Sequence, residues 1–215
     1  RDCNRINERW LSISQTGKDY MGNFLPTYIR SFSEWRAPLV MYMTAPFVAI
    51  LGPNTLSVRL PIALTGILSI YLLYLVLNKL GYSSKVSAFA SLILAITPWH
   101  IHYSRASFEV VPLTFLILLG LYLYLSKMFY VSLIPFVLTF YTYSTAVVFT
   151  PLLLLGLLII FPPNFKKINY VSILSVLLAT FLLIPVFRNI LFGNAANRFQ
   201  SLSNLSSSYL IDRVV

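Results

Sequence analysis

The stretch Thr97-Pro-Trp-His-Ile-His-Tyr-Ser-Arg-Ala-Ser-Phe-Glu109 separates two strongly apolar runs. It holds both histidines of the chain, and Glu109 is the only acidic residue between Glu34 and Asp212. A carboxylate, a guanidinium, two imidazoles and an indole thus meet at the boundary of apolar segments, where ionisable groups of membrane proteins are functional candidates. A simpler interpretation is that Arg105 and Glu109, four residues apart, form an interfacial salt bridge near a helix end.

The composition around this stretch is that of a membrane protein. The 215 residues are 58% hydrophobic and only 10% charged, whereas soluble proteins carry about 25% charged residues. The net charge of +10 does not indicate nucleic-acid binding, because lysines and arginines lie in short loops between apolar runs, where they set topology. The single cysteine, Cys3, excludes an intramolecular disulfide. The chain starts at Arg1 without a signal-peptide pattern, so we expect an internal fragment of a longer protein.

Charge and hydropathy divide the chain into three parts. Residues 1–56 begin with a charged segment and predict an external loop. Within it, Ala37 to Leu51 covers only about 15 of the roughly 20 apolar residues that a span needs, so we expect an interfacial helix. Residues 57–192 form the apolar body, and residues 193–215 predict the start of a truncated external loop. The apolar runs of the body are 57–78, 84–99, 110–126, 128–161 and 168–192.

The run 128–161 is too long to be a single span. As one helix it would measure about 51 Å, against roughly 30 Å of hydrocarbon. It must therefore fold back, and its most polar part, Tyr141-Thr-Tyr-Ser-Thr145, is where we expect the turn. The sequence thus predicts an all-α fold, a polytopic transmembrane helical bundle of about six spans.

The positions of the lysines predict the orientation of the spans. If the span that starts at Ser57 runs inward, five lysines in alternate loops are all cytoplasmic, as the positive-inside bias requires. These are Lys79, Lys85, Lys127, Lys166 and Lys167. The opposite face then receives Arg105, Glu109 and both histidines. One alternative stays open, because the six basic residues before Ala37 would be cytoplasmic if Ala37 to Leu51 crossed the membrane.

Several motifs occur together and in a set order along the chain. They are Ser14-Gln-Thr-Gly-Lys-Asp-Tyr-Met-Gly-Asn-Phe-Leu-Pro26, Ala37-Pro-Leu39, Gly52 with Val58-Arg-Leu-Pro61, and Pro98-Trp-His-Ile-His-Tyr-Ser-Arg105 with Glu109. In order and spacing they resemble the amino-terminal half of GT-C membrane glycosyltransferases, in particular the protein-mannosyltransferase and aminoarabinose-transferase branch. Tyr141-Thr-Tyr143 is similar to a later landmark of that family. The resemblance implies a multi-pass protein of the cell membrane that transfers sugar from a polyprenyl-phosphate donor on the non-cytoplasmic face.

The resemblance also implies two catalytic positions. In that family an Asp-Glu pair after the first transmembrane helix supplies the catalytic acid/base, and counting back from Ser12 places the aspartate at Asp2. A second acidic position falls on Glu109, which the resemblance places on the same side. Cys3 stands where the glutamate of the pair is expected, and the first transmembrane helix is absent. We therefore expect the fragment itself to be inactive.

The chemistry of such a transfer assigns roles to these groups. A base must accept the proton of the acceptor hydroxyl, and a cation must stabilise the departing phosphate. We expect Asp2 to be the base, unless it is merely a solvated residue near a chain end, and Arg105 to be the phosphate partner, because its planar fork suits phosphate. Glu109 would orient Arg105, hold a divalent metal ion or contact the acceptor. Some family members use metal at this face, but the sequence does not name ligands.

Four further residues are candidates for substrate binding: His100, His102, Tyr141 and Tyr143. The two histidines, being i and i+2, do not share a helix face, so a metal pair is less favoured than one interface residue and one polar contact. Trp99 and Tyr103 are typical of an interfacial aromatic belt.

A transporter or channel subunit is the competing class, since buried charges would then mark the pathway. In this chain the spans are nearly free of charge and the polar groups gather on one face. This pattern favours chemistry at the membrane surface over transport or a purely structural scaffold. The acceptor and the sugar are not predicted.

Overall fold

The computed structural model describes residues 29–31, 34–36, 38–143, 145–163 and 169–192, and these form a helical fold. The helices are α2 (Leu39–Leu51), α3 (Thr55–Lys79), α4 (Ser84–Ile96), α5 (Pro98–Ala106), α6 (Val110–Leu125), α7 (Phe129–Thr139), α8 (Ala146–Ile160) and α9 (Tyr170–Phe192). A short antiparallel hairpin of β1 (Ile29–Ser31) and β2 (Glu34–Arg36) precedes them, with Ile29 opposite Arg36. The prediction of an all-α fold is confirmed, with this hairpin as its one small exception in the described residues.

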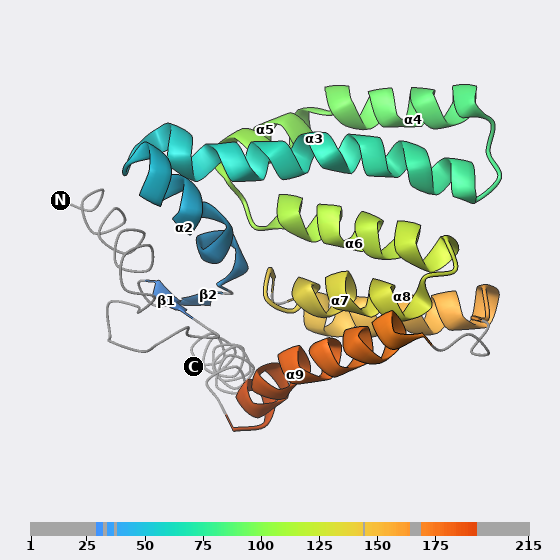
Figure 1. Ribbon diagram of the computed structural model, residues 1–215. Coiled ribbons are helices and arrows are strands. Elements are labelled where there is room, and N and C mark those ends of the chain that lie inside the picture. Colours follow the sequence, from blue (N-terminus) through green and yellow to red (C-terminus); the bar gives the residue numbers. More distant parts are fainter. Residues whose placement is uncertain (1–28, 32–33, 37, 144, 164–168, 193–215) are drawn as a thin grey trace, which may run out of the picture.

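Helix α3 is the helix around which the first half is built, and it packs against α2, α4, α5 and α6 (Figure 1). Its start is fixed by a capping box: Asn54 accepts a hydrogen bond from the amide of Ser57 at 2.8 Å, and the Ser57 hydroxyl accepts one from the amide of Asn54. The core beside it consists of Val40, Ile62 and Val111, all nearly or fully buried. This core joins α2, α3 and α6.

The long apolar run 128–161 divides into α7 and α8, and the break lies at the polar stretch where the sequence predicts a turn. The hydroxyls of Thr139 and Thr150, both fully buried, lie 2.8 Å apart and join the two helices. Where α8 ends, the carbonyl of Phe161 accepts a hydrogen bond of 2.8 Å from the hydroxyl of Tyr124 in α6. Helix α7 also packs against α6 and α9, so the second half forms a layer beside α6.

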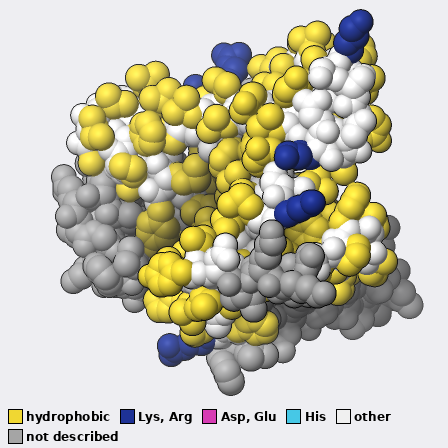
Figure 2. Space-filling view, turned by 45° about the vertical axis from the view of Figure 1, so that its right-hand side comes forward, with side chains coloured by type: hydrophobic (Ala, Val, Ile, Leu, Met, Phe, Trp, Pro, Cys, Tyr) yellow, Lys and Arg dark blue, Asp and Glu magenta, His cyan; other side chains and the backbone are white. Residues whose placement is uncertain are grey.

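Among the residues that the structure describes, two helices are long and apolar enough to cross a membrane: α3 and the Tyr170–Arg188 part of α9. A third span results if α5 and α6, which are bent by 113°, are counted together. The surface agrees with a lipid environment, because large hydrophobic side chains are widely exposed on α4, α8 and α9. Figure 2 shows one such face, where hydrophobic side chains predominate and lysines and arginines stand singly. The chain is therefore a membrane protein; the prediction of about six spans stays a prediction.

The charged residues of the body gather at the helix ends. Lys79 ends α3, Lys85 lies in the first turn of α4, and Lys127 joins α6 to α7. These three junctions lie at the same end of the helices, on the right of Figure 1, whereas the start of α3 and helix α5 lie toward the opposite end. Basic groups of the described helices therefore fall into two separate sets. Lys166 and Lys167 lie outside the described residues.

Candidate functional site

The stretch 97–109 folds into a short helix and a sharp corner. Thr97 precedes α5 with an extended backbone, and Pro98 occupies the first turn, where its missing amide hydrogen costs nothing. Ser107 ends the helix in the left-handed region, at φ 59° and ψ 42°. Glu109 then stands directly before α6. Because α5 and α6 meet at 113°, Arg105 in α5 and Glu109 before α6 are not one turn apart on a single helix.

An open groove of about 550 Å³ lies along one side of α5. Its polar groups are Arg59 from the second turn of α3 and His102 and Arg105 from α5. Its apolar wall is formed by Ile96, Pro98, Ile101 and Ala106. We call this site the α3–α5 groove. All three polar side chains are exposed to it or to the surroundings.

The groove is basic. Its lining contains two guanidiniums and an imidazole, and it contains no carboxylate among the described residues. Within the same part of the chain, neither Arg59 nor Arg105 has an ion-pair partner. Two arginines that have no ion-pair partner among the described residues favour an anionic ligand, and a guanidinium suits the oxygens of a phosphate. The apolar wall beside them suits a ligand that also carries a hydrocarbon part.

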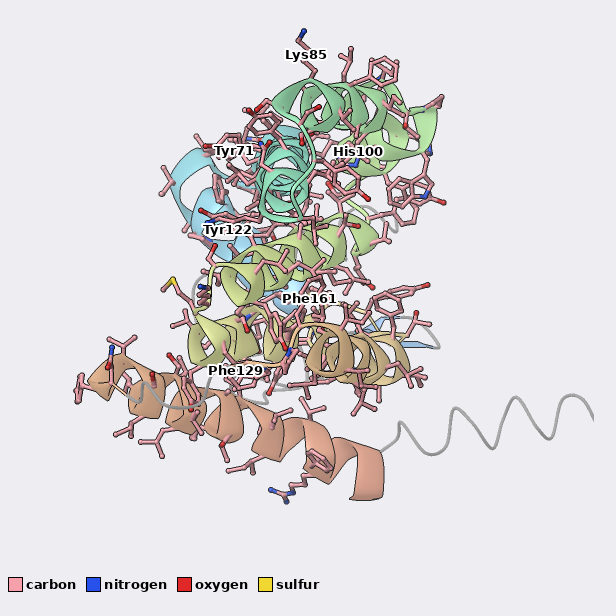
Figure 3. The ribbon with its side chains drawn as sticks, turned by 90° about the vertical axis from the view of Figure 1, so that its right-hand side faces the viewer. Tyr71, Lys85, His100, Tyr122, Phe129 and Phe161 are labelled. Atoms are coloured by element: carbon pink, nitrogen blue, oxygen red, sulfur yellow. The ribbon has the colours of Figure 1, made fainter. Side chains whose placement is uncertain are left out.

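The two histidines of α5 point in different directions, as their spacing predicts. His102 lines the groove, whereas His100 is only 3% exposed and lies against α3, with its Nε2 3.1 Å from the carbonyl oxygen of Gly66. Figure 3 shows His100 directed toward α3. A metal pair made of these two side chains is not formed. In the described part of the chain no group of three or more His, Cys, Asp or Glu side chains comes together, so these residues supply no ligand set for a divalent cation.

The remaining predicted site residues lie away from the groove or outside the described residues. Tyr141 lies in the turn between α7 and α8, where its hydroxyl donates to the carbonyl of Leu182 in α9 and its own carbonyl accepts from the amide of Leu39. Tyr143 lies in the same turn with 42% of its surface exposed. Neither tyrosine lines the groove. Glu109 is half-buried at the corner between α5 and α6. Asp2 lies outside the described residues, so its approach to Glu109 stays a prediction.

Arg59 is the groove residue that the sequence analysis does not select. It belongs to the motif Val58-Arg-Leu-Pro61 and is the only charged residue of α3 before Lys79. A lone arginine near the start of an apolar helix was the available signal. Its convergence with Arg105 depends on how α3 and α5 pack, which the spacing of residues along the chain does not reveal.

The chain is similar to known proteins. Residues 35–195 match the family model described as "Dolichyl-phosphate-mannose-protein mannosyltransferase". A curated relative, "Putative mannosyltransferase YycA" of Bacillus subtilis (strain 168), is 34% identical over 85 residues, which cover 40% of this chain and 12% of that protein. The match thus spans about an eighth of the relative's length. No solved structure matches the chain.

Proposed function

The chain belongs to the dolichyl-phosphate-mannose-protein mannosyltransferase family, and we propose that it is part of a membrane glycosyltransferase that uses a polyprenyl-phosphate sugar donor. The acceptor is reached on the non-cytoplasmic face of the cell membrane. Family membership supports sugar transfer, and the apolar helical surface supports a donor that is held in the lipid phase. The sugar and the acceptor are left open.

The observation that carries the proposal is the pairing of Arg59 and Arg105 in one groove with an apolar wall. A lipid-phosphate donor has the matching parts, an anionic phosphate and a hydrocarbon chain. Positive groups at the phosphate stabilise the negative charge that develops on it as the bond between sugar and phosphate breaks. In the proposal the two guanidiniums bind the phosphate oxygens and His102 donates or accepts a hydrogen bond beside them.

The proposed base is Asp2, which removes the proton from the acceptor hydroxyl as that oxygen attacks the sugar carbon. The bond between the sugar and the phosphate breaks, and the polyprenyl phosphate departs as an anion toward Arg59 and Arg105. Glu109 orients the groove or the acceptor from the α5–α6 corner. Glu109 itself does not line the groove, but it stands three residues after Ala106, which does.

The sidedness of the proposal follows from the separation of charges. Lys79, Lys85 and Lys127 lie at one end of the helices, and we assign that end to the cytoplasm by the positive-inside bias, while Arg59 and Arg105 toward the other end are assigned to the ligand. The α3–α5 groove lies toward the opposite end, which is then external. A multi-pass arrangement with an external active site is therefore the interpretation that we propose.

The test uses the full-length protein in liposomes, supplied with a labelled polyprenyl-phosphate hexose and a mixture of hydroxyl acceptors. We expect labelled sugar to move to an acceptor and polyprenyl phosphate to be released. A transporter would instead move solute across the membrane without any transfer. Flux without transfer would overturn the proposal, and so would transfer that proceeds only from a water-soluble nucleotide sugar.

A further inference from the structure

Helix α5 is held against α3 by a buried histidine. The side chain of His100 is almost entirely enclosed, and its Nε2 lies 3.1 Å from the carbonyl oxygen of Gly66 in the middle of α3. A carbonyl oxygen only accepts, so Nε2 must carry the hydrogen and donate it. The lone pair of Nδ1 is then the other polar site of the ring. It is buried and has no hydrogen-bond partner among the described residues.

The close contact between α5 and α3 depends on Gly66, because glycine has no side chain. A Cβ atom added there would lie 2.5 Å from the Oγ of Ser104 and 3.2 Å from its Cβ. Ser104 follows His100 by one helical turn, so both side chains lie on the face of α5 that meets α3. A larger residue at position 66 would therefore require Ser104 or the helices to shift.

A second contact fixes the direction of α5. Beyond Ser104, the hydroxyl of Ser107 lies 3.5 Å from the carbonyl oxygen of Val58. Between these two contacts Tyr103 packs against the core of Val40, Ile62 and Val111. Helix α5 therefore runs antiparallel along α3, from Gly66 back toward its start. Arg59 is the residue next to Val58.

The other side of α5 forms the groove. His102 and Arg105 line it together with Arg59, while His100 and Ser104 face α3. The position of α5 along α3 thus determines where His102 and Arg105 lie relative to Arg59. If α5 rotated or slid on α3, the two guanidiniums would no longer meet one ligand.

Two buried polar atoms at this contact lower the stability of the protein, which packing alone does not explain. A buried polar atom without a partner costs about 1–3 kcal/mol, and both His100 Nδ1 and Ser104 Oγ are in this position among the described residues. An apolar side chain of similar size would fill the space without that cost. The hydrogen bond to Gly66 is what the histidine adds, and it specifies one register between the helices, as interhelical hydrogen bonds in membranes do.

We propose that His100 is a positioning residue: with Gly66 it fixes α5 on α3 so that His102 and Arg105 face Arg59 across the α3–α5 groove. The fixing of α5 is independent of any ligand. Only its consequence for binding rests on the proposed function, which makes the ligand a polyprenyl phosphate.

The first experiment compares His100→Leu with His100→Gln in the full-length protein. Gln retains an N–H that can reach the Gly66 carbonyl, whereas Leu does not. Two quantities are measured: hydrogen exchange of the α5 amides without ligand, and binding of polyprenyl phosphate in detergent micelles. We expect His100→Leu to speed exchange about three- to tenfold, which corresponds to the loss of one net hydrogen bond, and to weaken binding. His100→Gln should stay close to the wild type in both.

His102→Leu is the matched control on the same helix. It changes the groove but not the contact with α3, so it should weaken binding and leave the exchange of the α5 amides unchanged. Unchanged exchange in His100→Leu would overturn the proposal. Faster exchange with undiminished binding would overturn the link to the groove. If the wild type binds no polyprenyl phosphate while the exchange result holds, the proposed function fails and the fixing of α5 stands.

A second set of variants does not depend on replacing the histidine. Gly66→Ala should also speed exchange of the α5 amides, because the new methyl group collides with Ser104. In Gly66→Ala/Ser104→Ala the 2.5 Å contact is removed, and the 3.2 Å contact with the Cβ of residue 104 and an ordinary 3.5 Å contact with Val111 remain, so a smaller increase is expected. Such coupling between the two positions identifies a direct contact. Additive effects would contradict the close crossing of α3 and α5.

Discussion

Arg59 of α3 and Arg105 of α5 line the same groove, although they come from different helices and the chain passes through α4 between them. The two guanidiniums converge because α5 folds back antiparallel along α3, with His100 at Gly66 and Ser107 near Val58. Both arginines are exposed, and an anion that enters the groove can contact both of them. The ligand proposed here supplies that anion.

Replacing either arginine should weaken binding of the lipid phosphate. Arg105→Ala and Arg59→Ala each remove a charged hydrogen-bonding group, and such a loss typically costs about 1.5–3 kcal/mol, or about tenfold or more in affinity. Arg105→Lys keeps the charge but not the fork and should fall between Ala and the wild type. Equilibrium binding of a labelled polyprenyl phosphate measures this. Arg188→Ala, in α9 and outside the groove, is the control and should bind normally.

The membrane orientation is open to a labelling test. In a full-length background from which Cys3 and any other cysteine have been removed, single cysteines are placed beside Lys85, beside Lys166 and at Ser107. An impermeant thiol reagent added outside intact cells should label only the Ser107 site, because the lysine end is expected to be cytoplasmic. External labelling at Lys85 would reverse the orientation and move the groove to the wrong side for the proposed reaction.

The contact between α6 and α7 predicts a strong effect on stability. In Gly120→Ala the new methyl carbon would lie 2.8 Å from two ring atoms of Phe136, which is 1% exposed. Overpacking of this kind costs about 1–3 kcal/mol, so thermal unfolding in detergent should begin at a lower temperature. Gly156→Ala in α8 is the matched control, because nothing among the described residues lies within 4 Å of its new methyl group. Equal unfolding temperatures for the two variants would disprove the contact.

Tyr141 distinguishes a structural role from the predicted role in substrate binding. Tyr141→Phe removes the hydroxyl that donates to the Leu182 carbonyl and should lower stability by about 1 kcal/mol. Because Tyr141 does not line the groove, donor affinity should be unchanged. Tyr143 is 42% exposed and does not line the groove, so Tyr143→Phe should change neither quantity. Unfolding midpoints and donor binding are measured together; a loss of donor affinity in Tyr141→Phe with normal stability would restore the substrate role.

Helix positions were predictable because they depend on local composition. The apolar runs that begin at Ser57, Ser84, Val110 and Ile168 coincide with α3, α4, α6 and α9, and the polar stretch around Tyr143 marks the break between α7 and α8. Each of these apolar runs forms a helix, so the change from apolar to polar residues in the sequence marks where that helix begins and ends.

The arrangement of the groove was not predictable in the same way. The corner at Ser107 separates Arg105 from Glu109, and the crossing at Gly66 turns His100 inward and His102 outward. Both features depend on contacts between helices, as does the convergence of Arg59 with Arg105. The spacing of the histidines predicted that they differ, but not which one would face α3.

Asp2 carries the proposed chemistry and its loss should be selective. Asp2→Asn removes the base but keeps the shape, so the transfer rate of the full-length enzyme should fall about 10²- to 10⁴-fold while donor binding is largely kept. Arg105→Ala should instead act mainly on the affinity for the donor, which it should lower. Single-turnover transfer and equilibrium binding separate the two effects. Full activity of Asp2→Asn would remove Asp2 from the mechanism without affecting the groove.

The central claim is that sugar is transferred from a lipid phosphate bound by Arg59 and Arg105. The most direct measurement offers the full-length enzyme two donors of the same hexose, one on polyprenyl phosphate and one on a nucleoside diphosphate, and follows transfer in the wild type and in Arg105→Ala. We expect transfer from the lipid donor alone, and a loss of that transfer in Arg105→Ala at low donor concentration. Transfer from the nucleotide sugar at the same rate in Arg105→Ala as in the wild type would contradict the claim.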